Sequence, residues 1–207
     1  MGFHKGNFEI TVLVVSIVSC ICSLFIIVTV TIFSEMKKKM FMKFIYYIAW
    51  SDFLMNVASV FGFPRDGSAL CWAQGIIQNY FALCSFFWTT MLSYSMFSIV
   101  KYGKPNLKLW QMQLICWLFP LVLTLLPLSS AAYGTGSSDF QWCIIVGKDG
   151  YSDTYVVAWS YCAYFGWLIL SVILMTVWGI MSYLKIRELR NDGPNTQISI
   201  SLTLTKR

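Results

Sequence analysis

Five long apolar runs, joined by short polar loops, constrain the fold of this chain more than any other feature of its sequence. The runs are Phe8–Phe33, Phe44–Phe63, Trp72–Val100, Trp110–Ala132 and Thr154–Leu184. Each reaches the roughly 20 residues that a helix needs to cross a bilayer core. Backbone polar groups in lipid must be satisfied within their own segment, and the runs lack the alternating pattern of a barrel strand. The sequence therefore predicts an all-α membrane protein with five transmembrane helices.

The composition and the first run support this interpretation. Hydrophobic residues make up 57% of the chain and charged residues 12%, whereas a soluble protein has roughly 25% charged residues. The run Phe8–Phe33 is too long for the apolar region of a signal peptide, and no small-residue cleavage pattern follows it. We therefore expect it to remain as a signal anchor, and we expect membrane lipid to surround the protein.

The charges of the loops predict which side of the membrane each loop faces. Three segments are basic: those with Lys37, Lys38, Lys39 and Lys43, with Lys101, Lys104 and Lys108, and with Lys185, Arg187 and Arg190. The other two loops are neutral or acidic, with Arg65 beside Asp66, and with Asp139, Asp149 and Asp153 against Lys148. Because cytoplasmic loops carry the excess of Lys and Arg, the N-terminus is expected outside and the three basic segments inside. The net charge of +6 thus reflects topology, and no nucleic-acid partner is expected.

The residues that carry catalytic or metal chemistry are scarce. Two of the seven cysteines, Cys71 and Cys143, fall in loops assigned to the outside, where the oxidising exterior permits a disulfide. The other five lie in the apolar runs, where cysteine packs as a small apolar side chain. His4 is the single histidine, and no cysteine or histidine spacing suits a metal. The chain is therefore predicted to be no enzyme and to use no metal or cofactor.

Polar residues at helical spacing form stripes on three of the runs. The members of these stripes are Asp52, Asn56 and Ser59; Gln74, Gln78, Ser85, Thr89 and Ser93; and Ser160, Tyr164, Trp167 and Ser171. Residues three or four apart share one face of a helix, so these faces are expected to point into the bundle. Two interpretations remain open: hydrogen bonds between helices, each worth about 0.6 kcal/mol on average, or a wet cavity. For Gln74 and Gln78, near the outer end, a cavity is favoured.

One block of residues resembles a known family. Cys71-Trp72-Ala73-Gln74-Gly75, followed by Gln78, Phe81, Ser85 and Phe86-Phe87-Trp88-Thr89, resembles the third helix of the cyclic AMP receptor-like group of G-protein-coupled receptors. Ser51-Asp52-Phe53-Leu54 resembles the Ser-Asp-Leu pattern of its second helix, and Gln141-Trp142-Cys143 resembles its second outer loop. The resemblance reaches to about Leu184. It implies a multi-pass receptor of the plasma membrane that receives signals at the cell surface.

The resemblance also implies roles for individual residues. Cys71 and Cys143 are expected to form the disulfide that ties helix three to the second outer loop. The buried polar groups expected to set the resting and active packings are Asp52, Asn56, Ser85 and Thr89. Candidates for the ligand pocket are Gln74, Gln78, Tyr161 and Tyr164. The face expected to meet a heterotrimeric G protein carries Lys101, Lys104, Lys185 and Arg187.

The family has seven helices, whereas five apolar spans are seen here. We therefore expect helices six and seven to be lacking, residues 1–190 to form the bundle, and residues 191–207 to form a disordered cytosolic tail. The first alternative is a non-signalling membrane partner, which associates with itself or with full-length receptors. A lower alternative is a small oligomeric channel or transporter, which would require more buried charge than Asp52 provides. The extracellular ligand is not specified by the sequence.

Overall fold

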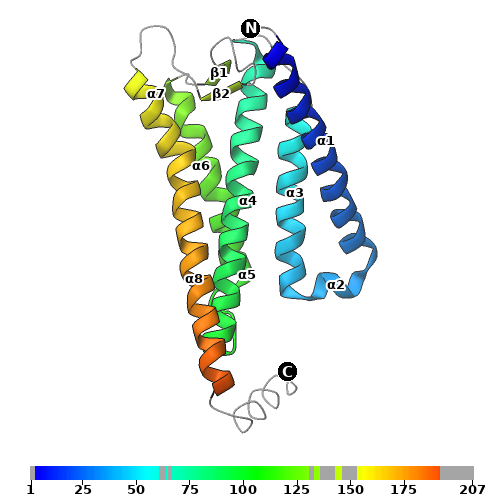
Figure 1. The fold of residues 1–207 in the computed structure, drawn as a ribbon, viewed down its shortest axis with the longest axis vertical. Coiled ribbons are helices and arrows are strands. Elements are labelled where there is room, and N and C mark those ends of the chain that lie inside the picture. The colour runs from blue at the N-terminus through cyan, green and yellow to red at the C-terminus, as the bar shows by residue number, and fades with distance from the viewer. Residues whose placement is uncertain are drawn as a thin grey trace.

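The computed structural model describes residues 3–60, 64, 67–130, 133–135, 143–145 and 153–191, and these form an elongated helical bundle (Figure 1). Helices occur at all five predicted spans. In chain order the elements are α1 (Phe3–Ile32), α2 (Ser34–Lys38), α3 (Met40–Val60), α4 (Ala69–Tyr102), α5 (Leu109–Gln113), η1 (Leu114–Leu118), α6 (Phe119–Leu125), η2 (Leu126–Ser130), β1 (Tyr133–Thr135), β2 (Cys143–Ile145), α7 (Asp153–Ser160), η3 (Tyr161–Phe165) and α8 (Gly166–Asn191). The long helix α4 occupies the middle, and it contacts α3 on one side and α8 on the other.

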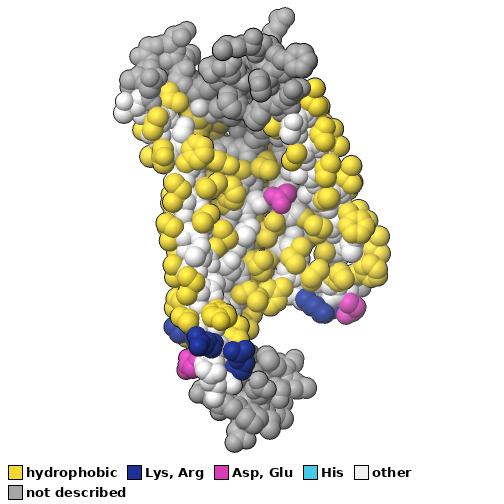
Figure 2. All heavy atoms as spheres, in the orientation of Figure 1, with side chains coloured by type: hydrophobic (Ala, Val, Ile, Leu, Met, Phe, Trp, Pro, Cys, Tyr) yellow, Lys and Arg dark blue, Asp and Glu magenta, His cyan; other side chains and the backbone are white. Residues whose placement is uncertain are grey.

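Length and hydropathy mark four stretches of the described chain as able to cross a membrane: Ile10–Ile32, Ala69–Tyr102, Leu109–Ser129 and Val156–Asn191. Helix α3, which corresponds to the second predicted span, is 21 residues long. It packs between α1 and α4 and completes the set of five bundle helices. Lys43, Asp52 and Asn56 lower its hydropathy, because they interrupt its apolar residues. Figure 2 shows hydrophobic side chains over most of one face of the bundle, as expected of a surface that meets lipid.

Both ends of α4 have capping groups that the apolar run did not indicate. The helix begins three residues before Trp72, because the Ser68 hydroxyl accepts a hydrogen bond from the amide of Cys71 at 3.1 Å. It ends at Gly103, which adopts a left-handed φ of 70° and donates its amide to the carbonyl of Ile99. These caps extend α4 from the outer loop to the basic loop at the opposite end.

The fourth span is not a uniform α-helix, and its prolines explain why. Pro120 has no N–H to offer the carbonyl of Cys116, and the chain widens into a π-helical turn over Leu114–Leu118 just before it. Pro127 lies in the 3₁₀ turn Leu126–Ser130 that ends the span. The distortion of the span is thus distributed over two short turns, one beside each proline.

The remaining bounds differ modestly from the predicted ones. Helix α8 continues past Leu184 to Asn191, so its last two turns carry the basic residues that the sequence assigned to the cytosol. The residues after Asn191, expected to form a tail, lie outside the described residues, as does the predicted end of the second span at Phe63. A short antiparallel hairpin, β1 paired with β2, was not expected in an all-α protein.

An aromatic cluster fills the contact between α3, α4 and the fourth span. Trp88 is fully buried, stacks on Tyr47 with ring centroids 4.6 Å apart and meets Phe44 edge-on at 5.7 Å. Met112 and Cys116 of the fourth span complete this cluster. Aromatic pairs of this kind contribute about 0.5–1.5 kcal/mol beyond the area they bury, so the cluster holds α4 against both neighbours.

Candidate functional site

A disulfide fixes the outer hairpin to the beginning of α4. Cys71 of α4 and Cys143 of β2 are bonded, with their Cα atoms 5.3 Å apart and a sequence separation of 72 positions. This confirms the pair that the resemblance implied. The hairpin lies so close to α4 that a Cβ added at Gly75 would sit 2.8 Å from Tyr133 Cδ1 and 2.9 Å from the carbonyl oxygen of Cys143. Gly75 therefore gives the hairpin the space to dock.

Tyr133 anchors the hairpin inside the bundle. Its side chain is 3% exposed, and its hydroxyl donates to the backbone carbonyl of Thr124 at 3.0 Å. The same hydroxyl accepts from Asn79 Nδ2 at 3.1 Å. Burial raises the pKa of Tyr133 to about 12, against a smaller opposing effect of the Asn79 hydrogen bond, so the phenol keeps its proton at neutral pH. No local sequence pattern links a loop tyrosine to two helices, so this triad of Tyr133, Asn79 and Thr124 was not predicted.

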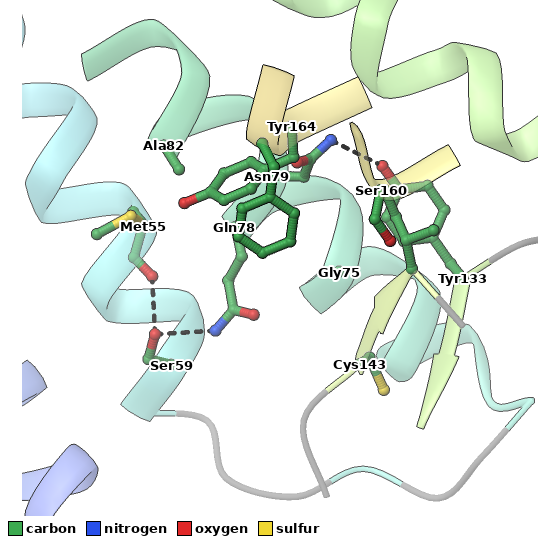
Figure 3. Close-up of a pocket in the computed structure, with 12 residues that line it drawn as sticks. Met55, Ser59, Gly75, Gln78, Asn79, Ala82, Tyr133, Cys143, Ser160 and Tyr164 are labelled. Carbon is green, nitrogen blue, oxygen red and sulfur yellow. Dashed lines mark hydrogen bonds between the residues drawn. The ribbon is translucent and has the colours of Figure 1, made fainter. Parts of the chain in front are cut away.

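A cavity of about 310 Å³ lies beneath the hairpin (Figure 3). Its walls come from α3, the outer half of α4, the hairpin, and the end of α7 with the π-helical turn η3. The lining residues are Met55, Ser59, Gly75, Gln78, Asn79, Ala82, Tyr133, Cys143, Ile145, Ser160, Tyr164 and Phe165. A volume of this size lies at the lower end of the roughly 300–1,000 Å³ found for small-molecule sites.

Two of the four ligand-pocket candidates lie in this cavity. Gln78 lines it and donates from Nε2 to the Ser59 hydroxyl at 2.8 Å, and Tyr164 extends its ring into it. Gln74 is instead buried between helices, and its Nε2 donates to the carbonyl of Ala58 at 2.9 Å. Tyr161 is 53% exposed and lies outside the cavity. The structure therefore brings Gln78 and Tyr164 together and places the other two elsewhere.

The π-helical turn η3 explains why the side chain of Tyr164 lines the cavity whereas that of Tyr161 is exposed outside it. A π turn contains an additional residue, so the helix after it is rotated relative to an uninterrupted α-helix. Gly166 is packed directly against this turn, since a Cβ there would lie 2.6 Å from the carbonyl oxygen of Tyr161. Trp167 Nε1 donates to the carbonyl of Cys162, which lies in the same turn, at 2.8 Å.

Of the four predicted buried polar residues, two meet each other across helices. Ser85 of α4 donates to Asp52 Oδ1 of α3 at 2.7 Å. The other two bond within their own helices: Asn56 donates to the carbonyl of Asp52, and Thr89 donates to the carbonyl of Ser85. The pair Asp52 and Ser85 lies one helical turn below Met55 and Ala82, so it is located just under the cavity.

The four predicted partner-face residues lie at the end of the bundle opposite to the hairpin. Lys101 rests over the rings of Phe97 and Tyr102, at 5.4 and 5.1 Å. Lys185 forms an ion pair with Glu188 at 2.8 Å, and Lys104 and Arg187 are exposed. Figure 2 shows basic side chains gathered at this end. Among the described residues no group of three or more His, Cys, Asp or Glu side chains is placed to hold a metal ion.

Comparison with known proteins agrees with this arrangement. The family model of the slime mold cyclic AMP receptor matches residues 4–206. A protein of Arabidopsis thaliana called G-protein coupled receptor 1 is 29% identical over 77% of this chain and 50% of its own length. Cyclic AMP receptor-like protein A of Dictyostelium discoideum is 33% identical over 59% of this chain and 32% of its own length. The chain thus spans about half, or less, of the length of these relatives.

The fold comparison points to the same architecture. The crystal structure of squid rhodopsin superposes with a TM-score of 0.61, and it covers 89% of this chain and 53% of the rhodopsin chain at 15% identity. That likeness shows the fold of a heptahelical receptor. Together with the apolar helices and the receptor relatives, it makes this a receptor-like, multi-pass protein of the plasma membrane. The chain belongs to the slime mold cyclic AMP receptor family.

Proposed function

We propose that this protein receives an extracellular ligand in the cavity beneath the hairpin and passes the resulting change to a heterotrimeric G protein at its basic end. The observation that carries the proposal is the cavity itself, at the outer end and walled by a hairpin that a disulfide and Tyr133 hold in place. Such a preformed site with a few convergent polar groups is the usual setting for small-molecule binding.

Helix α4 provides a direct mechanical connection between the two ends. It is 34 residues long, which corresponds to about 51 Å of helix, and it carries Gln78 in the cavity and Lys101 at the basic end. A ligand can favour one packing of α4 against α3 only if its contacts differ between the two packings. The hydrogen bond from Ser85 to Asp52 lies at this contact and just below the cavity. We infer that ligand binding changes the α3–α4 contact there.

The basic end suits a partner with acidic or carbonyl-rich surface. Lys101, Lys104 and Arg187 are exposed at the ends of α4 and α8. The last turns of α8 extend these charges beyond the apolar part of the helix. Complementary charge accelerates encounter and fixes orientation more than it raises affinity. Reversal of Lys101 and Lys104 to Glu is therefore expected to slow G-protein engagement and to leave ligand binding intact.

The experiment pairs a ligand screen with two alanine positions on α4. Cells expressing the chain with a resonance-energy-transfer sensor between Gα and Gβγ are exposed to a diverse small-molecule library. Each active compound is retested on Ala82→Trp, which fills the cavity, and on Ala73→Trp, which lies on an exposed face of the same helix. The proposal expects the first variant to abolish the responses and the second to preserve them. Responses that survive Ala82→Trp in surface-localised protein would contradict it.

A second role, as a membrane partner of other chains, is favoured by the position of Asp52. Its side chain is only partly buried in the bundle, although its Oδ1 accepts from Ser85. A carboxyl group facing hydrocarbon costs several kcal/mol, and a neighbouring helix that covers it removes this cost. In the second role, Asp52→Leu is expected to reduce energy transfer between differently labelled copies, or with longer receptors, in the same membrane. Energy transfer that is unchanged by Asp52→Leu would exclude that role.

A further inference from the structure

We propose that the cavity accepts an uncharged, mostly apolar molecule with one hydrogen-bond donor and one acceptor, rather than an anion such as a cyclic nucleotide. This inference rests on the proposed function, because it specifies the chemistry of the ligand in the same cavity. It separates this chain from the ligand that the family name suggests. Three observations support it: the lining, the polar groups that remain available, and the acidic group below the floor.

The lining is uncharged throughout the described part of the cavity. Met55, Ala82, Ile145 and Phe165 supply apolar wall, and the ring of Tyr164 adds to it. The polar members are amides, hydroxyls and backbone groups. An ion that leaves water for such a site loses its hydration without gaining a counter-charge, which is far more costly than the transfer of a neutral molecule. The walls therefore select against charge of either sign.

The polar side chains of the cavity are only partly engaged with one another. Asn79 donates to the Tyr133 hydroxyl, which in turn donates to a backbone carbonyl, so both groups hold the hairpin. Gln78 uses its amide nitrogen on Ser59. In Figure 3 no hydrogen bond joins the Gln78 carbonyl oxygen or the Tyr164 hydroxyl to another of the residues drawn. An acceptor and a donor thus remain for a ligand, and they come from two different elements, α4 and η3.

The ionisable group beneath the cavity is acidic. Asp52 lies one turn below Met55, and Ser85, one turn below Ala82, already directs its hydroxyl to that carboxyl group. A phosphate or carboxylate in the cavity would approach this acidic group and find the nearby Ser85 hydroxyl already committed. A neutral ligand needs no counter-charge from the floor of the cavity. The floor of the cavity therefore disfavours an anionic ligand, as the walls do.

The test uses two fluorescent probes that share a skeleton and differ in charge. N-phenyl-1-naphthylamine is neutral and carries one N–H donor, and 1-anilinonaphthalene-8-sulfonate adds a sulfonate to the same rings. The chain is reconstituted in phosphatidylcholine nanodiscs, and specific binding is the saturable signal above that of Ala82→Trp. We expect the neutral probe to bind wild type and Ala73→Trp, and the sulfonate and competing cyclic AMP to bind at least about tenfold more weakly.

Two further variants assign the hydrogen bond. The N–H of the neutral probe should donate to the Gln78 carbonyl oxygen, so Gln78→Met should weaken it roughly fivefold, which corresponds to the loss of one hydrogen bond. Tyr164→Phe should leave it unchanged, because the probe offers no strong acceptor. Formation of the Cys71–Cys143 disulfide on non-reducing gels confirms that each variant folds. If Ala82→Trp fails that check, Met55→Trp fills the cavity from α3 instead.

The outcomes separate this inference from the proposed function. Tight, cavity-dependent binding of the sulfonate or of cyclic AMP would overturn the neutral-ligand inference and leave the receptor function standing. Absence of saturable neutral-probe binding would also overturn it, and the cellular responses lost in Ala82→Trp would then still support reception. Saturable neutral-probe binding, combined with cellular responses that survive Ala82→Trp, would support the site and overturn the function.

Discussion

The Ser85 hydroxyl donates a 2.7 Å hydrogen bond to Asp52 Oδ1 and so joins α4 to α3 one turn below the cavity. Both residues belong to predicted polar stripes, but this contact unites the two stripes and connects the floor of the cavity to the packing of the helices. Hydrogen bonds between membrane helices contribute about 0.6 kcal/mol on average and up to about 1.7 kcal/mol. A hydrogen bond of this strength can break when a ligand stabilises a different packing of α4 against α3.

Ser85→Ala is expected to destabilise the bundle by about 0.6–1.7 kcal/mol, because it removes the donor to Asp52. The control is Thr89→Ala on the same helix, whose hydroxyl bonds to the backbone carbonyl of Ser85 within α4. Thr89→Ala should lower the free energy of unfolding by less than Ser85→Ala does, since the Thr89 hydrogen bond does not join α4 to a second helix. Thermal unfolding in nanodiscs, followed by tryptophan fluorescence, measures both. Equal losses in the two variants would refute the assignment of Ser85 as the interhelical contact.

Gly75→Ala should displace the hairpin. The added Cβ meets Tyr133 Cδ1 at 2.8 Å and the Cys143 carbonyl oxygen at 2.9 Å, and a backbone atom cannot move aside as a flexible side chain does. We expect a loss of about 1–3 kcal/mol, typical of overpacking, and a smaller fraction of molecules with the disulfide on non-reducing gels. Gly179→Ala, with open space around its Cβ position, should be neutral or stabilising. Complete disulfide formation and unchanged stability in Gly75→Ala would contradict the docking.

Tyr133 should make the protein sensitive to alkaline pH. Its pKa is raised to about 12 in the folded protein, from about 10 in the unfolded chain. Because the folded pKa is the higher one, the stabilisation is fully present below about pH 10 and is lost as the pH rises toward 12. The unfolding midpoint should therefore fall over this window, and Tyr133→Phe should reduce the fall. The same pH dependence in both proteins would show that other groups cause it.

Gly166→Ala should disturb the π-helical turn that directs Tyr164 into the cavity. The new Cβ would lie 2.6 Å from the Tyr161 carbonyl oxygen, so the turn must shift or revert toward an α-helix. We expect a loss of about 1–3 kcal/mol and weaker neutral-probe binding, because Tyr164 leaves the wall. Gly179→Ala on the same α8 again serves as the control. Probe affinity that matches the wild type would mean that the turn is not needed to form the site.

The residues that sequence reasoning placed well are those with strong, one-dimensional signals. Helix-length apolar runs predicted the five helices, and the resemblance predicted the Cys71–Cys143 disulfide. Helical spacing brought Asp52 and Ser85 to inward faces, and it also indicated Gln78 and Tyr164. Such signals record which face of a helix is polar. They do not record how far that face is rotated or which neighbour it meets.

The missed features depend on contacts between distant segments. Gln74 and Gln78 both bond to α3, Gln74 to the carbonyl of Ala58 and Gln78 to the hydroxyl of Ser59, yet only Gln78 lines the cavity. Tyr161 was grouped with Tyr164, and the π-helical turn separated them. Tyr133 could not be recognised, since its partners Asn79 and Thr124 lie on two other helices. The hairpin itself has three residues in each strand, too few for a strand pattern.

The reciprocal effect of G protein on ligand affinity is the decisive measurement of coupling between the cavity and the basic end. Binding free energies at two coupled sites must influence each other equally, and couplings of this kind typically amount to about 5–150-fold in affinity. The affinity of a cavity ligand is measured in cell membranes with and without co-expressed heterotrimeric G protein. We predict tighter ligand binding with G protein. This gain in affinity should be lost on addition of a GTP analogue and in the double variant Lys101→Glu, Lys104→Glu. Identical affinity with and without G protein would contradict the claim that the cavity and the basic end act as one receptor.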